Sequence, residues 1–375
     1  MSEPLDASAV RRSNRRAVLN ELRRAGTTNR SPLAAATGLT APTVRALVDD
    51  LVRCGLAELD APAATGSLGR PANIVRYPGR DWGIAVLQFG PTYHRVSVTD
   101  GTGHQMALVR TEATKHTRRA VTRAVATAHS LASEHGLRLV TGVAVVTGRV
   151  DGGTVDSELL GWRCVELEGL ITSALGVPVT VHNASLAAGY RELCEGAGTK
   201  VRRFVVIDSS NDVSGVTYVD GQLVTMDPVA LGELPVSPND RTTVFEMAGM
   251  SAMLRRYRAE TGVRATRVAS LISAADSGDT RARQVVVDAC RALSFAARWL
   301  IALAAPEQLV LSGALVDLPP EGRHMLRDLI SAEIDASVPV VFSDVGSFSW
   351  VRGGELIGVD QVRVLEDATI ASTLG

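Results

Sequence analysis

Several residue types are scarce in this sequence, and each scarcity excludes a class of protein. Among 375 residues there are only 4 cysteines, and they are scattered without a Cys-x-x-Cys pair. Neither a zinc cluster nor a disulfide framework is therefore predicted. Reduced cysteines are typical of the cytoplasm, where we expect this protein. No apolar run approaches the roughly 18 residues of a membrane span, and the N-terminal stretch lacks the apolar core of a signal peptide.

Lysine is almost absent, occurring only at positions 115 and 200. Arginine supplies nearly every positive charge, so a single arginine carries little information. A hydrophobic content of 46% supports sizeable cores, and the length suits two or three domains. The net charge of −1 is unevenly placed, because residues 1–80 carry 12 arginines against 7 acidic residues and the remainder is acidic. A basic segment on a mildly acidic body is typical of a DNA-reading module attached to a regulatory body.

The most informative stretch is residues 31–59, which predicts two short helices joined by a tight turn. Ser31 can cap the first helix, Gly38 can end it in a left-handed conformation, and Thr40 can cap the second. Apolar residues then recur at helical spacing: Val44, Leu47, Val48 and Leu51. The pattern favours a helix-turn-helix, although a helical hairpin packed on a larger core remains the alternative.

The flanking residues extend this motif to a winged helix-turn-helix. Residues 14–25 form an amphipathic helix before it. After it, Leu56–Leu59 is predicted to be a strand, Asp60–Gly69 a loop and Asn73–Tyr77 a returning strand. A helical trio followed by a strand hairpin is the winged arrangement of DNA-binding domains.

The second helix of the motif, Thr40 to Cys54, is the predicted recognition helix. Its first residues would face the major groove, and Arg45 is the best candidate for pairing with guanine. The other predicted DNA contacts are Thr40, Pro42 and Thr43 at the groove, and Arg15, Arg16 and Arg30 at phosphates. Arg70, in Gly69-Arg70-Pro71, either enters a narrow minor groove or lies in a simple linker turn.

One winged module buries little surface, so tight binding to double-stranded DNA usually needs two. We therefore expect a homodimer or homotetramer on an inverted-repeat operator. The long helix predicted near Thr280–Ala304 is a candidate for part of the interface, with core burial as the alternative for most of it.

From about residue 80 onward the pattern changes to strands alternating with helices. The paired strands predicted at Gly83–Phe89 and Arg95–Thr99, with a turn at Asp100-Gly101, are followed by helices. A second set of strands, with a turn at Asp220-Gly221, is followed by helices again. This repetition predicts an α/β body of two lobes.

The order of these features resembles the ROK family (repressors, open reading frames and sugar kinases), whose regulators carry a winged helix-turn-helix before an actin-like, sugar-kinase-like body. The resemblance spans nearly the whole chain. Besides Gly69-Arg70-Pro71, it rests on GVPVTVHNASLAAGYRELCEGAG (176–198), VDGQL (219–223), LGEL (231–234), FEMAG (245–249) and PEQLVLSGAL (306–315). It implies a DNA-binding domain and linker over 1–79 and an effector or dimerisation body over 80–375. The lobes would span about 80–195 and 196–345, with 346–375 packing back.

The departures from the family pattern concern phosphoryl transfer. Gln88 stands where a family kinase has an acidic residue, and Pro91 replaces a glycine of the first phosphate loop. The second loop, 209–215, is poor in glycine and contains Asp212, whose charge would repel phosphate. Asn183 occupies the place of the catalytic aspartate and cannot act as a general base near neutral pH. The chain is therefore predicted to have no catalytic residues and to bind no nucleotide cofactor.

The family's zinc motif is also interrupted, because Pro235-Val236 stands in place of Gly-His and no cysteine lies between Cys194 and Cys290. The family's sugar-binding positions are partly kept. The resemblance implies a pocket for a small polar, sugar-like effector formed by His182, Asn183, Glu233 and Glu246. The alternative is that the two glutamates are merely solvated or structural.

These observations favour a transcriptional regulator, most simply a repressor, with an inactive kinase-like domain that senses a ligand or only dimerises. Two alternatives remain open: a sugar kinase with an accessory DNA-binding head, and a regulator that senses no ligand.

Overall fold

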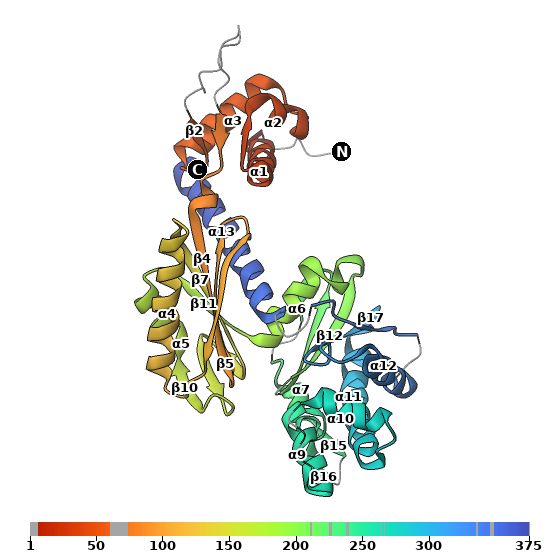
Figure 1. Ribbon diagram of the computed structural model, residues 1–375. Helices are drawn as coiled ribbons and strands as arrows, with labels where there is room; N and C mark the ends of the chain where they lie inside the picture. Colours follow the sequence, from red (N-terminus) through yellow and green to blue (C-terminus); the bar gives the residue numbers. More distant parts are fainter. Residues whose placement is uncertain are drawn as a thin grey trace.

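The computed structural model describes residues 7–60, 74–210, 212–224, 227–237, 240–263, 265, 267–334, 337–345 and 349–374. Figure 1 shows three parts: an N-terminal helical domain at one end and two α/β lobes side by side beyond it. A long C-terminal helix runs from the junction of the lobes to the N-terminal domain. No helix among the described residues is long and apolar enough to cross a membrane.

The N-terminal domain is a helical trio with a small sheet. Its elements are α1 (Ala7–Ala25), β1 (Thr27–Asn29), α2 (Arg30–Thr37), α3 (Ala41–Arg53), β2 (Glu58–Asp60) and β3 (Ile74–Arg76), with the sheet in the order β1-β3-β2. Gly38 ends α2 in the left-handed conformation (φ 68°), and Thr40 caps α3, as predicted. The cap of α2 is Asn29, not Ser31, because the helix begins two residues earlier than expected. Strand β1 was not predicted.

The first lobe is built on a five-stranded sheet in the order β11-β7-β4-β5-β6. A second, three-stranded sheet has the order β10-β9-β8. The sheet strands are β4 (Trp82–Phe89), β5 (Tyr93–Asp100), β6 (Gln105–Glu112), β7 (Arg138–Val146), β8 (Arg149–Asp151), β9 (Thr154–Ser157), β10 (Trp162–Glu166) and β11 (Val179–Asn183). The helices are η1 (Pro78–Asp81), α4 (Thr117–Glu134) and α5 (Leu167–Leu175). The next helices, α6 (Ala184–Glu195) and η2 (Ala197–Lys200), pack against the sheet of the second lobe.

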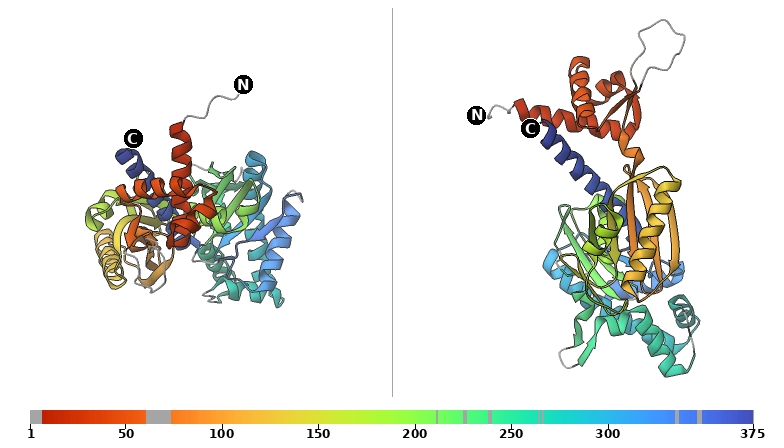
Figure 2. Two further views of the ribbon diagram at one scale, coloured as in Figure 1. Left: turned by 90° about the horizontal axis from the view of Figure 1, so that it is seen from above. Right: turned by 90° about the vertical axis from the view of Figure 1, so that its left-hand side faces the viewer.

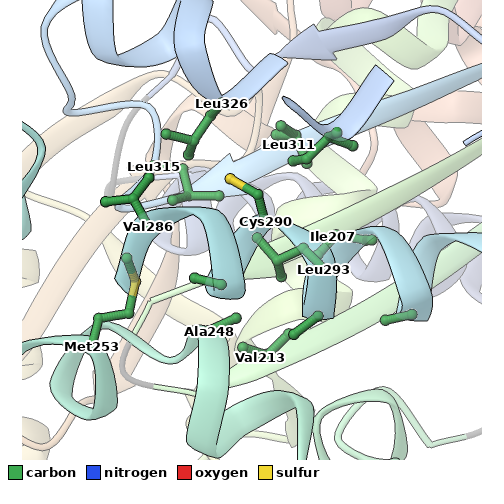
Figure 3. Packing of buried hydrophobic residues seen from close by; sticks show 14 of the residues in the cluster. Ile207, Val213, Ala248, Met253, Val286, Cys290, Leu293, Leu311, Leu315 and Leu326 are labelled. Carbon is green, nitrogen blue, oxygen red and sulfur yellow. The ribbon is translucent and has the colours of Figure 1, made fainter. Parts of the chain in front are cut away.

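The second lobe contains a five-stranded sheet in the order β14-β13-β12-β17-β18 and a β15-β16 hairpin. Its strands are β12 (Arg203–Ser209), β13 (Val213–Val219), β14 (Gln222–Leu223), β15 (Pro235–Ser237), β16 (Asp240–Thr243), β17 (Gln308–Gly313) and β18 (Val340–Phe342). Its helices are α7 (Ala230–Glu233), α8 (Val244–Ala248), α9 (Met250–Thr261), α10 (Val268–Asp276), α11 (Thr280–Ala304) and α12 (Pro320–Glu333). Figure 3 shows α11 packing Val286, Cys290 and Leu293 against apolar residues of the sheet and neighbouring helices.

The two lobes repeat one strand pattern. In the first, β4 pairs antiparallel with β5 and parallel with β7, which pairs parallel with β11. In the second, β12 pairs antiparallel with β13 and parallel with β17, which pairs parallel with β18. The repetition predicted from the two hairpins is therefore present in the strand order, and the body is a two-lobed α/β structure.

The C-terminal helix α13 (Ser349–Leu374) returns across the first lobe. Its glycines permit a close approach. A Cβ on Gly353 would lie 1.8 Å from the carbonyl oxygen of Ala187, and one on Gly358 would lie 2.3 Å from Cγ2 of Ile84. Beyond the lobe, Ile370 joins the apolar core of the N-terminal domain. Helix α13 thus contacts both the body and the N-terminal domain.

Candidate nucleic-acid interface and the kinase-like cleft

The recognition helix is held rigidly by the core of its own domain. Val44, Leu47, Val48 and Leu51 of α3 are buried against α1 and α2, as the helical spacing predicted. At the N-terminus of α3, the Thr43 amide donates to Thr40 Oγ1 at 3.4 Å, which satisfies one of the donors that a helix start leaves unpaired. The first turn of α3 therefore has a fixed position.

The residues predicted to read bases lie on the outer side of that turn. Thr40, Pro42 and Arg45 are exposed, and Thr43 is half-buried. Within the described part of the chain, the structure gives Arg45 no hydrogen bond or ion pair, so its guanidinium remains available to a base edge. Apolar burial on one side and exposed polar groups at the N-terminal end are what groove recognition requires.

The three arginines assigned to phosphates differ. Arg15 is buried, with 6% of its surface exposed, and it donates to Asp50 at 3.0 Å. A guanidinium buried in this way and paired with Asp50 does not lie on the surface that meets a DNA backbone, so the assignment of Arg15 as a DNA contact is wrong. Arg16 is exposed but pairs with Asp367 of α13, and half-buried Arg30 pairs with Asp49. Arg70 lies outside the described residues.

A connection that the sequence analysis missed lies where α13 meets the N-terminal domain. Glu366, which is 1% exposed, accepts a hydrogen bond from the Tyr77 hydroxyl at 2.6 Å and pairs with Arg23 of α1. Burial and the neighbouring Glu366 raise the pKa of Tyr77, so its hydroxyl remains a donor throughout the physiological range. No motif in the sequence connects residues 23 and 77 with residue 366; only the fold does.

In the body, the residue at the first phosphate-loop position, Gln88, is hydrogen-bonded to another side chain of the protein. Gln88 is buried, and its Oε1 accepts a hydrogen bond from Arg95 at 2.9 Å. Arg95 belongs to the partner strand β5, so the pair ties the two strands of the hairpin together.

The second phosphate-loop region surrounds a buried carboxyl group. Asp208 accepts hydrogen bonds from the Trp350 indole and the Ser210 hydroxyl, each at 3.0 Å, and burial raises its pKa. Burial and the nearby Asp208 raise the pKa of Asp212 to about 6. Asp212 is therefore mostly ionised at neutral pH, which is unfavourable for a bound phosphate.

Asn183 serves as the cap of α6. Its Oδ1 accepts from the Ser185 amide at 2.7 Å, and its Nδ2 donates to the Gly148 carbonyl at 2.6 Å. Both ends of the amide are engaged in the structure's own bonds.

His182 does not share a pocket with Asn183, contrary to expectation, because successive residues of β11 face opposite sides of the sheet. His182 Nε2 is 2.8 Å from Thr180 Oγ1, and burial lowers the pKa of its imidazole. It lines an apolar cavity of about 560 Å³ between α6, α13 and the β13–β14 hairpin. The prediction that the two residues bind one ligand together is therefore wrong.

Both glutamates assigned to the effector site have partners. Glu233 accepts from Arg149 at 2.9 Å, and Arg149 also donates to Asp227 at 2.7 Å. Glu246 forms a capping box with Thr243 at the start of α8. Glu233 lies near Asn183 through the neighbouring residues Gly148 and Arg149. Among the described residues, no group of three or more His, Cys, Asp or Glu side chains is placed to hold a metal ion.

Comparison with known proteins agrees with this arrangement. Residues 11–58 match the winged helix-turn-helix DNA-binding family. The crystal structure of a ROK family transcriptional regulator, a homologue of the Escherichia coli MLC protein, superposes with a TM-score of 0.74 at 17% identity, covering 97% of this chain and 99% of that one. The chain shares the fold of that regulator structure over nearly its whole length.

Other similar proteins include regulators and enzymes. A transcriptional regulator of Mycobacterium tuberculosis is 26% identical over 344 residues, covering 84% of this chain and 77% of its own. The bifunctional enzyme NanE/NanK of Brucella melitensis is 28% identical over 230 residues, covering 56% of this chain and 44% of its own. The ROK hexokinase from Thermus thermophilus superposes with a TM-score of 0.62 at 20% identity, covering 75% of this chain and 99% of that one. The kinase structure thus matches the body, whereas the regulator structure matches nearly the full length.

Proposed function

We propose that this ROK-type regulator is a sequence-specific repressor whose body has lost phosphoryl transfer. One observation carries the proposal. Arg45, Thr40 and Pro42 project from a capped, well-packed helix into solvent, whereas Gln88 and Asn183 in the kinase-like body are engaged in internal hydrogen bonds.

The domain boundaries follow from this assignment: residues 1–79 read DNA and residues 80–375 form the sensing and dimerising body. Two copies on an inverted repeat supply the interface area that a single winged module lacks. On α11, Trp299 and Leu303 are exposed apolar residues, with exposed fractions of 54% and 82%. We assign them to the contact between copies, and Leu303→Asp should shift the protein to a smaller species in analytical ultracentrifugation.

The effector proposed for the body is a small polar, sugar-like molecule held between the lobes near Glu233 and Glu246. Its binding would change the angle between the lobes and so the spacing of the paired DNA-binding domains. Thermal-shift screening of sugars and sugar phosphates tests this directly. Glu246→Gln is the informative variant, because glutamine preserves the capping box but removes the carboxylate.

Phosphoryl transfer is the second candidate, favoured by the NanE/NanK similarity and the kinase fold of the body. It requires a base and a phosphate cradle, and neither Asn183 nor the 209–215 loop supplies one. Measuring ATP turnover with hexoses and N-acetylated hexoses decides between the two, because turnover above background would contradict the proposal.

The main test is DNA binding by the full chain. Binding to its own upstream region, measured by fluorescence anisotropy, should depend on sequence and persist at physiological salt. Arg45→Ala should weaken specific binding about 10- to 100-fold, because one bidentate pair with a base contributes about 1–3 kcal/mol of discrimination. Arg119→Ala, an exposed arginine on α4, is the matched control and should change nothing. Sequence-independent binding by the wild type would refute the function.

A further inference from the structure

A basic cavity lies where the DNA-binding domain meets the C-terminal helix. It has a volume of about 720 Å³ and is bounded by α1, the C-terminal half of α3 and the last turns of α13. Five arginines line it: Arg11, Arg12, Arg15, Arg16 and Arg53. We call it the seam cavity.

The positive charge in the seam cavity exceeds the negative charge. Among the described residues, two carboxylates, Asp50 and Asp367, line it beside the five guanidinium groups. Asp50 pairs with Arg11 at 2.8 Å, Arg15 at 3.0 Å and Arg53, while Asp367 pairs with Arg16 at 2.8 Å. Burial opposes ionisation of Asp50, but the hydrogen bonds from Arg11 and Arg15 prevail and lower its pKa. Three positive charges are therefore left over.

Guanidinium groups in the seam cavity also have unused hydrogen-bond donors. Each guanidinium group carries five N–H donors. Asp50 has only two carboxylate oxygens, and the guanidinium groups of three arginines share them. Arg15 is buried, and within the described structure its Nε–H has no hydrogen-bond partner. A buried donor of a charged group without a partner is costly, and an anion in the cavity would lower that cost.

The seam cavity is separate from the recognition turn. The right-hand view of Figure 2 shows the end of α13 beneath the DNA-binding domain, on the side of the body. The lining residues of α3 are Asp50 and Arg53, at the opposite end of that helix from Thr40 and Arg45. The excess charge is thus placed at the junction with the body.

We propose that the seam cavity is a second ligand site, which takes a small anion with two or more negative charges, of the phosphate-ester or diphosphate class. Guanidinium forks match phosphate oxygens in geometry, and an excess of three charges suits a multivalent anion better than chloride.

Because its walls come from α1, α3 and α13, a bound anion fastens the DNA-binding domain to the helix that crosses the first lobe. This consequence for DNA binding rests on the proposed function, whereas anion binding itself does not. The ligand lies between Arg12, Arg53 and the other arginines of the seam cavity. It supplies the negative charge that these arginines lack.

The test uses pyrophosphate as the probe and isothermal titration calorimetry of the full chain, without DNA and at constant ionic strength. We expect one saturable site per chain. Arg12→Gln/Arg53→Gln should weaken binding at least tenfold, since both residues are exposed and lie on two different walls. Arg118→Gln/Arg119→Gln on α4 removes the same charge elsewhere and should leave binding unchanged. If the seam variant is poorly folded by circular dichroism, Arg12→Gln alone replaces it, with at least a threefold loss expected.

A second measurement locates the effect. With pyrophosphate, amide exchange should slow in residues 8–16 and 367–374, and not in α4. The proposal is overturned if no saturable binding occurs, if sulfate at equal ionic strength gives the same isotherm, or if both double variants weaken binding equally. It is also overturned if pyrophosphate does not bind but the seam variant weakens DNA binding uniformly across sequences. That result would assign these arginines to the DNA backbone.

Discussion

Polar side chains in the first turn of α3 are exposed, whereas comparable side chains in the kinase-like body are bonded within the protein. On α3, Arg45 projects outward from a helix whose other face is packed, and within the described residues no partner is given to its guanidinium. In the body, the Asn183 amide is bonded at both ends and Gln88 accepts from Arg95. A group that meets a ligand must exchange water for the ligand, whereas a group already bonded in the protein must first break that bond.

This difference suggests how a kinase-like body can change its use without losing its fold. On the proposed function, an amide in place of a catalytic carboxylate keeps the cap of α6 while removing the base. The buried Asp208, held by Trp350 of α13, links the second lobe to the helix that reaches the DNA-binding domain. Polar groups in the body thus support the scaffold, and those of α3 remain available.

The largest effect is expected at the contact between the two regions. Glu366→Ala leaves Arg23 without its carboxylate and the Tyr77 hydroxyl without its acceptor. Breaking a buried ion pair from one side typically costs about 3–5 kcal/mol. Chemical denaturation followed by circular dichroism should show a loss of this size in the free energy of unfolding of the DNA-binding domain.

The matched control for that experiment is Asp367→Asn, one residue further along α13. Its pair with Arg16 is largely exposed, so its loss should cost less than about 1 kcal/mol. Equal losses in the two variants would contradict the assignment of Glu366 as the main anchor.

The next largest effect is expected at Asp212, in the second phosphate-loop region of the body. Asp212 has a folded-state pKa of about 6, above the ordinary 3.8. A raised pKa means that the folded protein favours the protonated carboxyl group. The contribution of this protonated group to stability is fully present below about pH 4 and is lost as the pH rises through about 6. Asp212→Asn should therefore match the wild type near pH 4 and exceed it by up to about 3 kcal/mol at pH 8.

Thermal and denaturant unfolding at the two pH values measure that difference. Asp317→Asn, which removes an exposed carboxyl in the same lobe, is the matched control for the loss of one carboxylate. A constant difference between the Asp212 variant and the wild type from pH 4 to 8 would mean that Asp212 has an ordinary pKa.

The sequence predicted local features well because they depend on neighbouring residues. Gly38 and Thr40 bound the turn as expected, since a left-handed glycine and a threonine cap act within a few residues. The turns at Asp100-Gly101 and Asp220-Gly221 and the long helix of residues 280–304 were likewise predictable, although strand β6 after the first of these turns was not. The ROK architecture came from the resemblance, not from spacing alone.

What escaped prediction depends on contacts between distant residues. Exposure cannot be derived from residue type, so Arg15 was mistaken for a surface cation although Asp50 holds it in the interior. Strands β8, β9 and β10 were missed because each is short and only their mutual pairing defines them. The Glu366 contact joins residues more than 280 positions apart along the chain. The roles of Glu233 and Glu246 in binding a ligand remain predictions.

The smallest effect expected is at Asn183, and it completes the contrast with Arg45. Asn183→Ala removes the cap of α6 and the donor to Gly148, a loss of about 2 kcal/mol. Specific DNA affinity of the folded variant should be unchanged, the reverse of Arg45→Ala. Asn183→Asp retains the cap but places a carboxylate oxygen against the Gly148 carbonyl oxygen, so its loss should be at least as large. It should also gain no kinase activity, because Gln88 and the 209–215 loop still lack the groups that bind and orient ATP. Phosphoryl transfer by this variant would mean that a single substitution had inactivated the cleft.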